Sequence, residues 1–428
     1  MINIATKHDN FNAFGGLAHV FNALSGCGLQ ECIDGHLGQR GVRSTSFSYS
    51  DIFRALVAIY LTGGDCLEDV EALRGFWSRG ERMPSPDVIG RALKDLAVCD
   101  RYVESEGGHR YGFNGNTKLN SLLVKSVRML GLVDTLGDIV VDFDHQLIET
   151  ECKDAEFGYK GFFGMFPGVA AIGGAIVYVE NRDGNAPVRL AQHETLKRMF
   201  NNLEREFPSH SLVFRADAGS YSEQTIKTVM KRCSRFYIRA NTSEKRRAMY
   251  GEYDEWKPAE CNGERFEVAS FVVDDIVYGM PLRLVVQRTE KSDDGQPDLF
   301  GTQYVYRAIV TNDFDMEPVE VIRFYNQRGA IERNFDMQNN DFGWANMPFS
   351  RLCENEVFLV MTAMVKNFYL YLVRNVAKCV KGLEPTSRIK KFVRKFVAVP
   401  AKWIHTGRRL VLKLFTPYNF YDRLALLL

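Results

Sequence analysis

Residues 137–240 contain several short apolar runs that have the pattern of strands, and two amphipathic helix signals lie among the later ones. The runs "GDIVVDFD", "VAAIGGAIVYVE" and "LVFRADAG" have the length and composition of buried strands. Between the second and third runs, Leu196, Met199, Phe200, Leu203 and Phe207 recur at three-four spacing, which is typical of an amphipathic helix. The order strand, strand, strand, helix, strand, helix, strand predicts an α/β fold with a mixed sheet.

The region before this core, residues 1–120, has mainly helical patterns. The stretch "SYSDIFRALVAIYLTGG" predicts an apolar helix that ends at two glycines. Ser85 and Pro86 have the residue types of a helix cap and a first helical position. With "CLEDVEALRGFW" between them, these segments predict either a helix-turn-helix-like DNA-binding domain or a plain helical bundle.

The regions after residue 240 differ from the core. Three strand-like runs within about 241–315 predict a β-rich insertion, and residues 346–428 predict a helical C-terminal region. The formal net charge of the chain is only +1, so any nucleic-acid surface must be a local patch. Lys381–Lys413 carries ten Lys or Arg against one acid, which favours phosphate contact over a solvated basic helix. Its predicted DNA-binding residues are Lys390, Lys391, Arg394 and Lys395, with Phe392, Phe396 and Trp403 interleaved among the charges.

The cysteines and the apolar runs restrict the compartment. Nine cysteines without a CxxC pair argue against a disulfide framework and a zinc site, and favour a reducing compartment. The N-terminus lacks a basic start followed by an apolar run, so no signal peptide is expected. The uncharged run Gly161–Tyr178 contains five glycines and a proline, which predicts buried strands with turns and not a membrane span.

Carboxylates stand at three places that suit a metal site. Asp142 and Asp144 alternate with apolar residues, so both point to one face of a strand. Asp217 follows an apolar strand, at the end where α/β folds present site residues. Glu332 lies in a separate helical segment. Carboxylates from separate elements are typical Mg²⁺ ligands, although each acid alone could instead cap a helix or pair with a basic residue.

The stretch "FYNQRGAIERNFDMQNNDFGW", residues 324–344, predicts one helix with two faces. On it Tyr325, Arg328, Glu332, Asp336 and Asn339 fall within roughly 80° of one another. An apolar stripe of Phe324, Ile331, Phe335 and Phe342 lies beside them. The polar face is either a solvated ion-pair face or part of a site.

With these motifs the chain resembles the DDE transposases of bacterial insertion sequences, and most nearly the group numbered thirteen-eighty. Tyr325, Arg328 and Glu332 match the family signature Y-x2-R-x3-E-x6-K, in which Asn339 replaces the final lysine. "FRADAGS" resembles the second-aspartate motif and "DFDHQLIETE" the first. The resemblance implies Asp144, Asp217 and Glu332 as catalytic metal ligands, with Asp142 as the reserve candidate. It also implies DNA contacts by Tyr325, Arg328 and Asn339.

The resemblance implies an RNase H-like catalytic domain over residues 121–345 and two Mg²⁺ ions, with Mn²⁺ as a substitute. The implied activity is binding of terminal inverted repeats, cleavage at the element ends, and joining of 3′-hydroxyls to target DNA. The expected enzyme is a homodimer on paired ends, in the bacterial cytoplasm and without a membrane partner. Alternatives are a metal-dependent nuclease that does not join ends, and a non-catalytic DNA-binding protein derived from a transposase.

Overall fold

Five strands form the centre of a mixed sheet, and their order fixes where candidate site residues meet. A computed structural model describes residues 11–41, 46–76, 82–290, 303–407 and 409–424 of the chain. The central strands are β3 (Ile139–His145), β7 (Gly168–Ile172), β8 (Ala175–Arg182), β9 (Leu212–Ala216) and β10 (Arg235–Ala240). They lie in the order β8-β7-β3-β9-β10, with β3, β9 and β10 parallel and β7 antiparallel to β3 and β8. This confirms the predicted α/β class, and the arrangement is consistent with an RNase H-like core.

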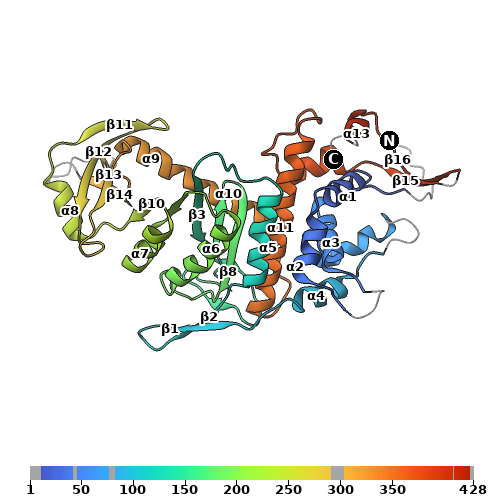
Figure 1. The fold of residues 1–428 in the computed structure, drawn as a ribbon, viewed down its shortest axis with the longest axis horizontal. Coiled ribbons are helices and arrows are strands. Elements are labelled where there is room, and N and C mark those ends of the chain that lie inside the picture. The colour runs from blue at the N-terminus through green and yellow to red at the C-terminus, as the bar shows by residue number, and fades with distance from the viewer. Residues whose placement is uncertain (1–10, 42–45, 77–81, 291–302, 408, 425–428) are drawn as a thin grey trace, which may run out of the picture.

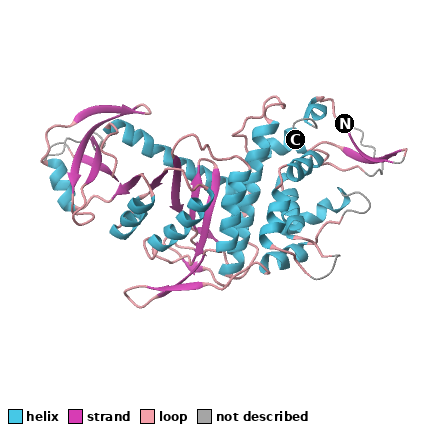
Figure 2. Cartoon of the chain, in the orientation of Figure 1, coloured by secondary structure: helices cyan, strands magenta, loops and turns pink. Residues whose placement is uncertain are grey.

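Helices cover both faces of this sheet (Figures 1 and 2). On one face α6 (Gln192–Glu206) buries its three-four stripe against β9, as the ring contact between Phe200 and Phe214 shows. The helix α7 (Glu223–Arg232) connects β9 to β10. On the other face α11 (Leu352–Val376) packs against β8, and α5 (Thr117–Met129) lies beside it. Beyond the sheet, α9 (Pro318–Asn326) and α10 (Ala330–Asp341) lead from the insertion back to α11.

The predicted β-rich insertion extends the central sheet instead of forming a separate layer. It contains α8 (Glu244–Gly251), β11 (Lys257–Cys261), β12 (Glu264–Val273), β13 (Leu282–Glu290) and β14 (Tyr304–Thr311). Because β14 pairs with β10, these strands continue one eleven-stranded sheet. At the opposite edge, β1 (Arg101–Glu104) and β2 (Arg110–Asn114) form a hairpin that pairs with β8. A separate small sheet joins β4 (Ile148–Glu149), β5 (Glu156–Phe157) and β6 (Phe163–Met165).

The N-terminal helices share one core with α11. They are α1 (Leu17–Gly26), α2 (Leu29–Leu37), α3 (Tyr49–Leu61) and α4 (Pro86–Lys94). The predicted caps occur, since Ser85 accepts a hydrogen bond from the Val88 amide. The middle segment, Leu67–Phe76, is a 3₁₀ helix, and every residue of α3 except Asp51 and Arg54 is buried. The central helix of this region therefore serves packing and presents almost no surface to a partner.

The helix α11 is long and apolar enough to cross a membrane by length and composition, yet 89% of its most apolar window is buried inside the fold. It also carries Glu356, a fully buried acid. The carboxylate of Glu356 accepts hydrogen bonds from the Asn181 amide at 2.9 Å and the Asn120 side chain at 3.4 Å. This network joins α11 to β8 and α5, so the helix is a core element of this fold.

The predicted helical C-terminal region contains a β-hairpin besides its helices. After α12 (Ile389–Phe392) and a π-helical turn over Val393–Val397, the chain forms a hairpin of β15 (Ala401–Thr406) and β16 (Arg409–Leu414). A short helix, α13 (Phe420–Leu424), follows. The chain reverses between these strands at Gly407, which adopts the left-handed conformation that glycine allows.

The C-terminal segment packs on the N-terminal helices (Figure 1). The main chain of Asn12 pairs with that of Ala401 as an antiparallel bridge. A Cβ atom added to Gly16 would lie 2.1 Å from the carbonyl oxygen of Phe396, so only glycine fits there. Tyr421 is also part of the core that includes α1.

Lys366 of α11 provides a first prediction, about pH. Its ammonium is fully buried and donates to the carbonyl of Gly174 at 2.5 Å and to Asn334 Oδ1 at 2.8 Å. Burial lowers the pKa of Lys366 to about 7, so between pH 7 and the usual lysine pKa the unfolded chain binds more protons than the folded one. Relative to Lys366→Met, the wild type should gain about 2 kcal/mol of unfolding free energy from pH 7 to about pH 9.

Urea titrations at the two pH values measure this difference. Exposed Lys378 supplies the control, because Lys378→Met should leave the pH dependence unchanged. An equal pH dependence of the wild type and Lys366→Met would show that the buried ammonium titrates normally.

Candidate active site

The two aspartates of β3 point to the same face, as predicted, but have different partners. Asp142 has a side chain only 2% exposed and forms a two-pronged ion pair with Arg215 of β9. Arg215 Nε lies 2.7 Å from Asp142 Oδ1, and its Nη2 lies 2.9 Å from Oδ2. Both carboxylate oxygens of Asp142 are therefore engaged by one guanidinium inside the fold.

Asp144 lies two residues further, at the carboxyl end of β3. Its side chain is 17% exposed, and its Oδ2 accepts a hydrogen bond from Arg328 Nη1 at 2.9 Å. Burial, followed by repulsion from Asp217, raises the pKa of Asp144 to about 6. Two carboxylates that interact in this way lie near each other in a site of low polarity.

Asp217 comes directly after β9, the parallel neighbour of β3. Phe143 pairs with Ala216 in the register of these strands, so Asp144 and Asp217 each follow a paired residue at the same sheet edge. Asp217 Oδ1 accepts from the Gly219 amide at 2.9 Å and caps a short 3₁₀ turn, Ala218–Ser220. The turn fixes the position of one oxygen of the Asp217 carboxylate.

The single helix predicted over residues 324–344 is wrong. The chain forms α9, a 3₁₀ turn over Gln327–Gly329, and then α10. The break contains Gly329, a residue of low helix propensity. Its apolar stripe is divided accordingly, because Phe324 packs with the insertion core whereas Ile331 and Phe335 belong to the core around α11.

Arg328, in this 3₁₀ turn, links the strand acids to the helix acid. Besides its bond to Asp144, its Nη2 lies 3.6 Å from Glu332 Oε1. The side chain of Glu332 is 69% exposed, and among the described residues Arg328 is its one ion-pair partner. Arg328 is thus a cation between two of the three predicted ligands.

The other two members of the motif lie deeper than a DNA contact would suggest. Tyr325 is 6% exposed, and its hydroxyl donates to the Ala216 carbonyl at 3.3 Å, one residue before Asp217. Asn339 is half-buried on α10, two turns after Glu332. The hydrogen bond from Tyr325 therefore holds the main chain at the end of β9, directly before Asp217.

Sequence reasoning missed three arginines around the acids, although charged residues within apolar strands were a visible signal. Arg215 is the partner of Asp142. Arg182 of β8 is 4% exposed and donates to the ring of His145 at 3.2 Å and to the Leu190 carbonyl at 2.7 Å. Arg239 of β10 is half-buried near Tyr325 and Arg328; burial lowers the pKa of Arg239. Within the described ranges, its guanidinium has no hydrogen bond or ion pair.

The predicted DNA-binding residues of the C-terminal region are all exposed, on α12 and the π-helical turn: Lys390, Lys391, Arg394 and Lys395. The interleaved rings have a different role, because Phe392 and Phe396 are fully buried core residues and not stacking surfaces. Arg388, just before α12, forms ion pairs with Asp336 and with Asp341, the latter at 2.6 Å. The basic segment is therefore attached to the helix that carries Glu332.

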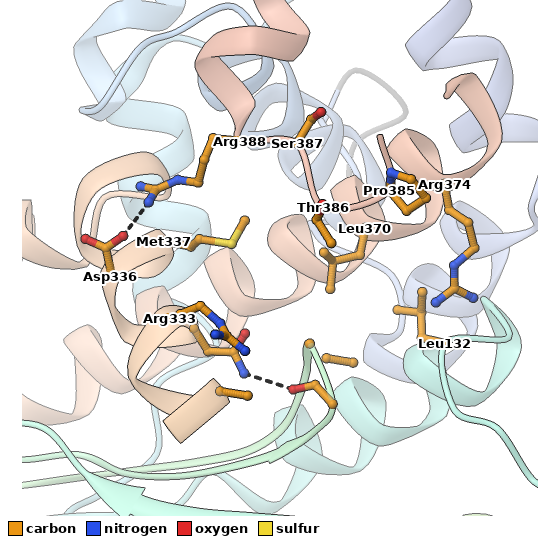
Figure 3. A pocket seen from close by; sticks show the side chains of 15 residues that line it. Leu132, Arg333, Asp336, Met337, Leu370, Arg374, Pro385, Thr386, Ser387 and Arg388 are labelled. Atoms are coloured by element: carbon orange, nitrogen blue, oxygen red, sulfur yellow. Dashed lines mark hydrogen bonds and ion pairs between the residues drawn. The ribbon is translucent and has the colours of Figure 1, made fainter. Parts of the chain in front are cut away.

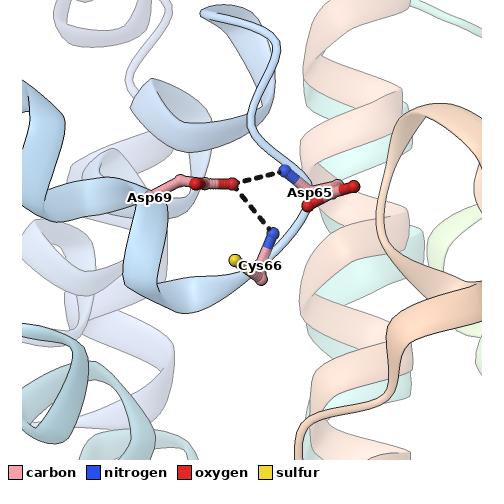
Figure 4. A group of neighbouring side chains, drawn as sticks. All are labelled: Asp65, Cys66 and Asp69. Atoms are coloured by element: carbon pink, nitrogen blue, oxygen red, sulfur yellow. Dashed lines mark hydrogen bonds between the residues drawn. The ribbon is translucent and has the colours of Figure 1, made fainter.

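A second group of side chains that could bind a metal, Asp65, Cys66 and Asp69, lies in the N-terminal region (Figure 4). Asp69 Oδ2 accepts hydrogen bonds from the backbone amides of Asp65 at 2.8 Å and Cys66 at 3.2 Å. Burial and Asp69 raise the pKa of the Cys66 thiol to about 11, so the thiol stays protonated. These contacts show that the Asp69 carboxylate stabilises the turn at Asp65 and Cys66, which accounts for the cluster without a metal ion.

The residues at the sheet edge fit a divalent cation. Asp144 and Asp217 repel each other, and the ligand atoms available with Glu332 are all carboxylate oxygens, which suit Mg²⁺ or Mn²⁺. Asp142 fits less well, because both its oxygens are already bonded to Arg215. The geometry thus favours Asp144 over Asp142 as a ligand.

A comparison with protein families matches residues 11–428 to the transposase DDE domain group 1. No curated protein matches the chain. The match spans the N-terminal helices, the sheet with its insertion and the C-terminal hairpin, which is nearly the whole chain. The protein therefore belongs to the DDE transposase family, domain group 1.

Proposed function

We propose that this transposase binds the terminal inverted repeats of its own element, cleaves the phosphodiester at the ends, and joins the 3′-hydroxyls to target DNA. One observation carries the proposal. Asp144 and Asp217 follow paired residues of adjacent parallel strands, and Arg328 forms ion pairs with both Asp144 and Glu332. The element that encodes it would be of the group numbered thirteen-eighty.

In this proposal Asp144, Asp217 and Glu332 hold two Mg²⁺ ions, for which Mn²⁺ can substitute. Bound ions of this kind activate the attacking oxygen and stabilise the leaving oxygen of a phosphodiester. Arg328 keeps Asp144 and Glu332 in place until DNA arrives and then binds a phosphate, since its planar fork suits two oxygens. Arg239 provides a second cation for the phosphates of the bound DNA strand. Tyr325 holds the main chain directly before Asp217.

DNA contact would extend over three regions: residues 1–120 as the DNA-binding domain, residues 121–345 as the catalytic domain with its insertion at about 241–315, and the basic part of 346–428. Asn339 would lie close to the DNA near Glu332. Since transposition pairs two ends, the active form would be a homodimer acting on the nucleoid in the cytoplasm.

The test uses the purified chain, a duplex carrying the terminal repeat that flanks its gene, and Mg²⁺. A nick at the repeat end and a joined product with plasmid DNA are the expected results. EDTA should abolish both. Cleavage without joining would indicate a nuclease, and binding without cleavage would indicate a DNA-binding relative; either result would contradict the proposal.

The basic segment gives a quantitative prediction about salt. The double variant Lys390→Ala/Lys391→Ala removes two exposed charges from the proposed DNA surface. If both contact phosphates, the slope of log K against log salt for the repeat duplex should fall in magnitude by about 2. Lys227→Ala/Lys231→Ala removes two exposed lysines from α7 and should leave the slope unchanged. Equal slopes for the two double variants would place the DNA elsewhere.

A further inference from the structure

The β15–β16 hairpin projects from the end of the molecule that carries the N-terminal helices (Figures 1 and 2). Its base is attached to the fold, since the main chain of Ala401 forms an antiparallel bridge with that of Asn12. The segment that leads into the hairpin is fixed as well, because Arg388 forms an ion pair with Asp336 of α10 (Figure 3). The hairpin is therefore a projecting two-stranded ribbon on a fixed base.

The register of the two strands divides the side chains of the ribbon between two faces. Directly opposed residues of an antiparallel pair lie on the same face, and the faces alternate along each strand. On one face, Leu412 and Leu414 pack against the core that the N-terminal helices share with α11. The other face, called the outer face below, carries three opposed pairs from tip to base: Thr406 with Arg409, Ile404 with Val411, and Lys402 with Lys413.

The outer face is cationic, and no acid of the hairpin balances its charges. The sequence contains no acidic residue between Glu384 and Asp422. Lys402 and Lys413 are directly opposed, and like charges in this position destabilise a strand pair. Arg409 and Lys413 are exposed and form no ion pair within the described part of the chain. An anion from outside would therefore stabilise this face.

Two exposed aromatic rings hold the lysines at the base of the outer face. Lys402 Nζ lies 5.6 Å from the ring centroid of Phe11, and Lys413 Nζ lies 5.7 Å from that of Phe415. The two rings contact each other edge to face, with their centroids 5.1 Å apart. A ring attracts the charge of an ammonium through its quadrupole and takes up no strong hydrogen bond. The N–H groups of Lys413 thus remain available to phosphate oxygens.

The shape and the residue types of the outer face fit the major groove of duplex DNA. Paired strands lie about 5 Å apart, and the groove, about 12 Å wide, admits a two-stranded ribbon. At the tip, the guanidinium of Arg409 suits N7 and O6 of guanine, and the hydroxyl of Thr406 suits several base edges. Exposed Val411 suits the methyl group of thymine. The lysines at the base would then face the phosphates, which position a protein on the duplex.

We propose that the β15–β16 hairpin enters the major groove of the terminal repeat and reads its bases. Arg409 and Thr406 would contact base edges, and Lys402 and Lys413 would contact phosphates. The inference rests on the proposed function in that the duplex is the terminal repeat of the element. Charge complementarity identifies the partner, because a duplex carries a regular line of phosphates on each side of the groove. The ribbon would add base reading to the phosphate contacts proposed for α12.

The experiment measures binding of the full chain to the terminal-repeat duplex by fluorescence anisotropy, in EDTA so that the DNA stays intact. Each guanine is replaced in turn by 7-deazaguanine, which lacks the N7 acceptor of the major groove and pairs normally. At one or two positions the affinity of the wild type should fall about tenfold. Arg409→Ala should bind the unmodified repeat about tenfold more weakly, show no further loss at those positions, and bind a scrambled duplex almost as the wild type does.

Three further variants serve as checks. Arg128→Ala removes an exposed arginine of α5 and should keep both the affinity and the response to 7-deazaguanine. Arg409→Lys keeps the charge and loses the planar fork, so it should keep the salt dependence and lose the response to 7-deazaguanine. Lys413→Ala should weaken binding to the repeat and the scrambled duplex equally and reduce the salt slope by about 1 in magnitude. Circular dichroism verifies that each variant is folded.

Three results would overturn the proposal. The first is a 7-deazaguanine scan in which no position depends on Arg409. The second is an equal loss of affinity for the repeat and the scrambled duplex in Arg409→Ala. The third is a lower sedimentation coefficient of the DNA-free chain in Arg409→Ala/Lys413→Ala, which would show that the outer face joins two copies of the chain.

Cleavage of the same duplexes in Mg²⁺ separates this proposal from the proposed function. A wild type that cleaves and joins the repeat, with no guanine that depends on Arg409, would refute base reading by the hairpin alone. A wild type that reads such a guanine and never cleaves would refute the proposed function alone.

Discussion

Asp144→Asn is expected to reduce cleavage of the terminal repeat by about a thousandfold or more while DNA binding persists. The reason is that the variant removes a charged ligand from the sheet edge, and metal ions contribute several kcal/mol to phosphodiester cleavage. Glu332→Gln should reduce cleavage in the same way, because it also removes a proposed carboxylate ligand. The variant should still fold, since Glu332 is largely exposed and makes few contacts that folding requires. A gel assay for the nick, with anisotropy for binding, measures both quantities.

The control for this prediction is Asp142→Asn, on the same face of the same strand. Both carboxylate oxygens of Asp142 accept hydrogen bonds from Arg215. Asp142→Asn should therefore lower the free energy of unfolding, while the molecules that remain folded should still cleave DNA. If Asp142→Asn instead removed cleavage and Asp144→Asn retained it, the first ligand would be Asp142.

The second large effect concerns stability. Arg215→Ala should lower the unfolding free energy by about 3–5 kcal/mol, because it leaves the buried carboxylate of Asp142 without its cation. It also removes the donor to the Phe324 carbonyl, which lies 2.5 Å from Arg215 Nη1 at the end of α9. Urea titration followed by circular dichroism measures the loss.

A double variant tests the cause. Asp142→Leu/Arg215→Met replaces the ion pair by apolar residues of similar size, and such replacements often cost little. The double variant should therefore be more stable than Arg215→Ala. A double variant as unstable as the single one would show that the loss comes from packing or from the Phe324 contact, and not from the unpaired charge.

The sequence predicts the central sheet well because each strand has a local signal. The β-branched runs around Asp144 and Asp217 are short and apolar, and the helix between Gln192 and Glu206 has a clean period. These patterns depend on neighbours in the chain. They place the candidate acids at strand ends without any knowledge of the rest of the molecule.

What the sequence could not predict depends on contacts between distant segments. The partner of Asp142 lies on another strand, so its alternation pattern looked the same as that of Asp144. The break at Gln327–Gly329 divides a helical period that continues on both sides. Phe392 and Phe396 alternate with basic residues in a way that is equally compatible with a DNA surface and with a buried anchor.

The packing of α1 against the C-terminal segment has a consequence for synthesis on the ribosome. Val20 and Leu24 share a core with Phe396 and Tyr421. At position 16 only glycine fits against the Phe396 carbonyl. Residues made in the first seconds of translation therefore expose apolar surface until residues beyond 390 have left the exit tunnel. The nascent chain would need a chaperone during that interval, and a transcript truncated before this segment would yield an aggregating product instead of a smaller active enzyme.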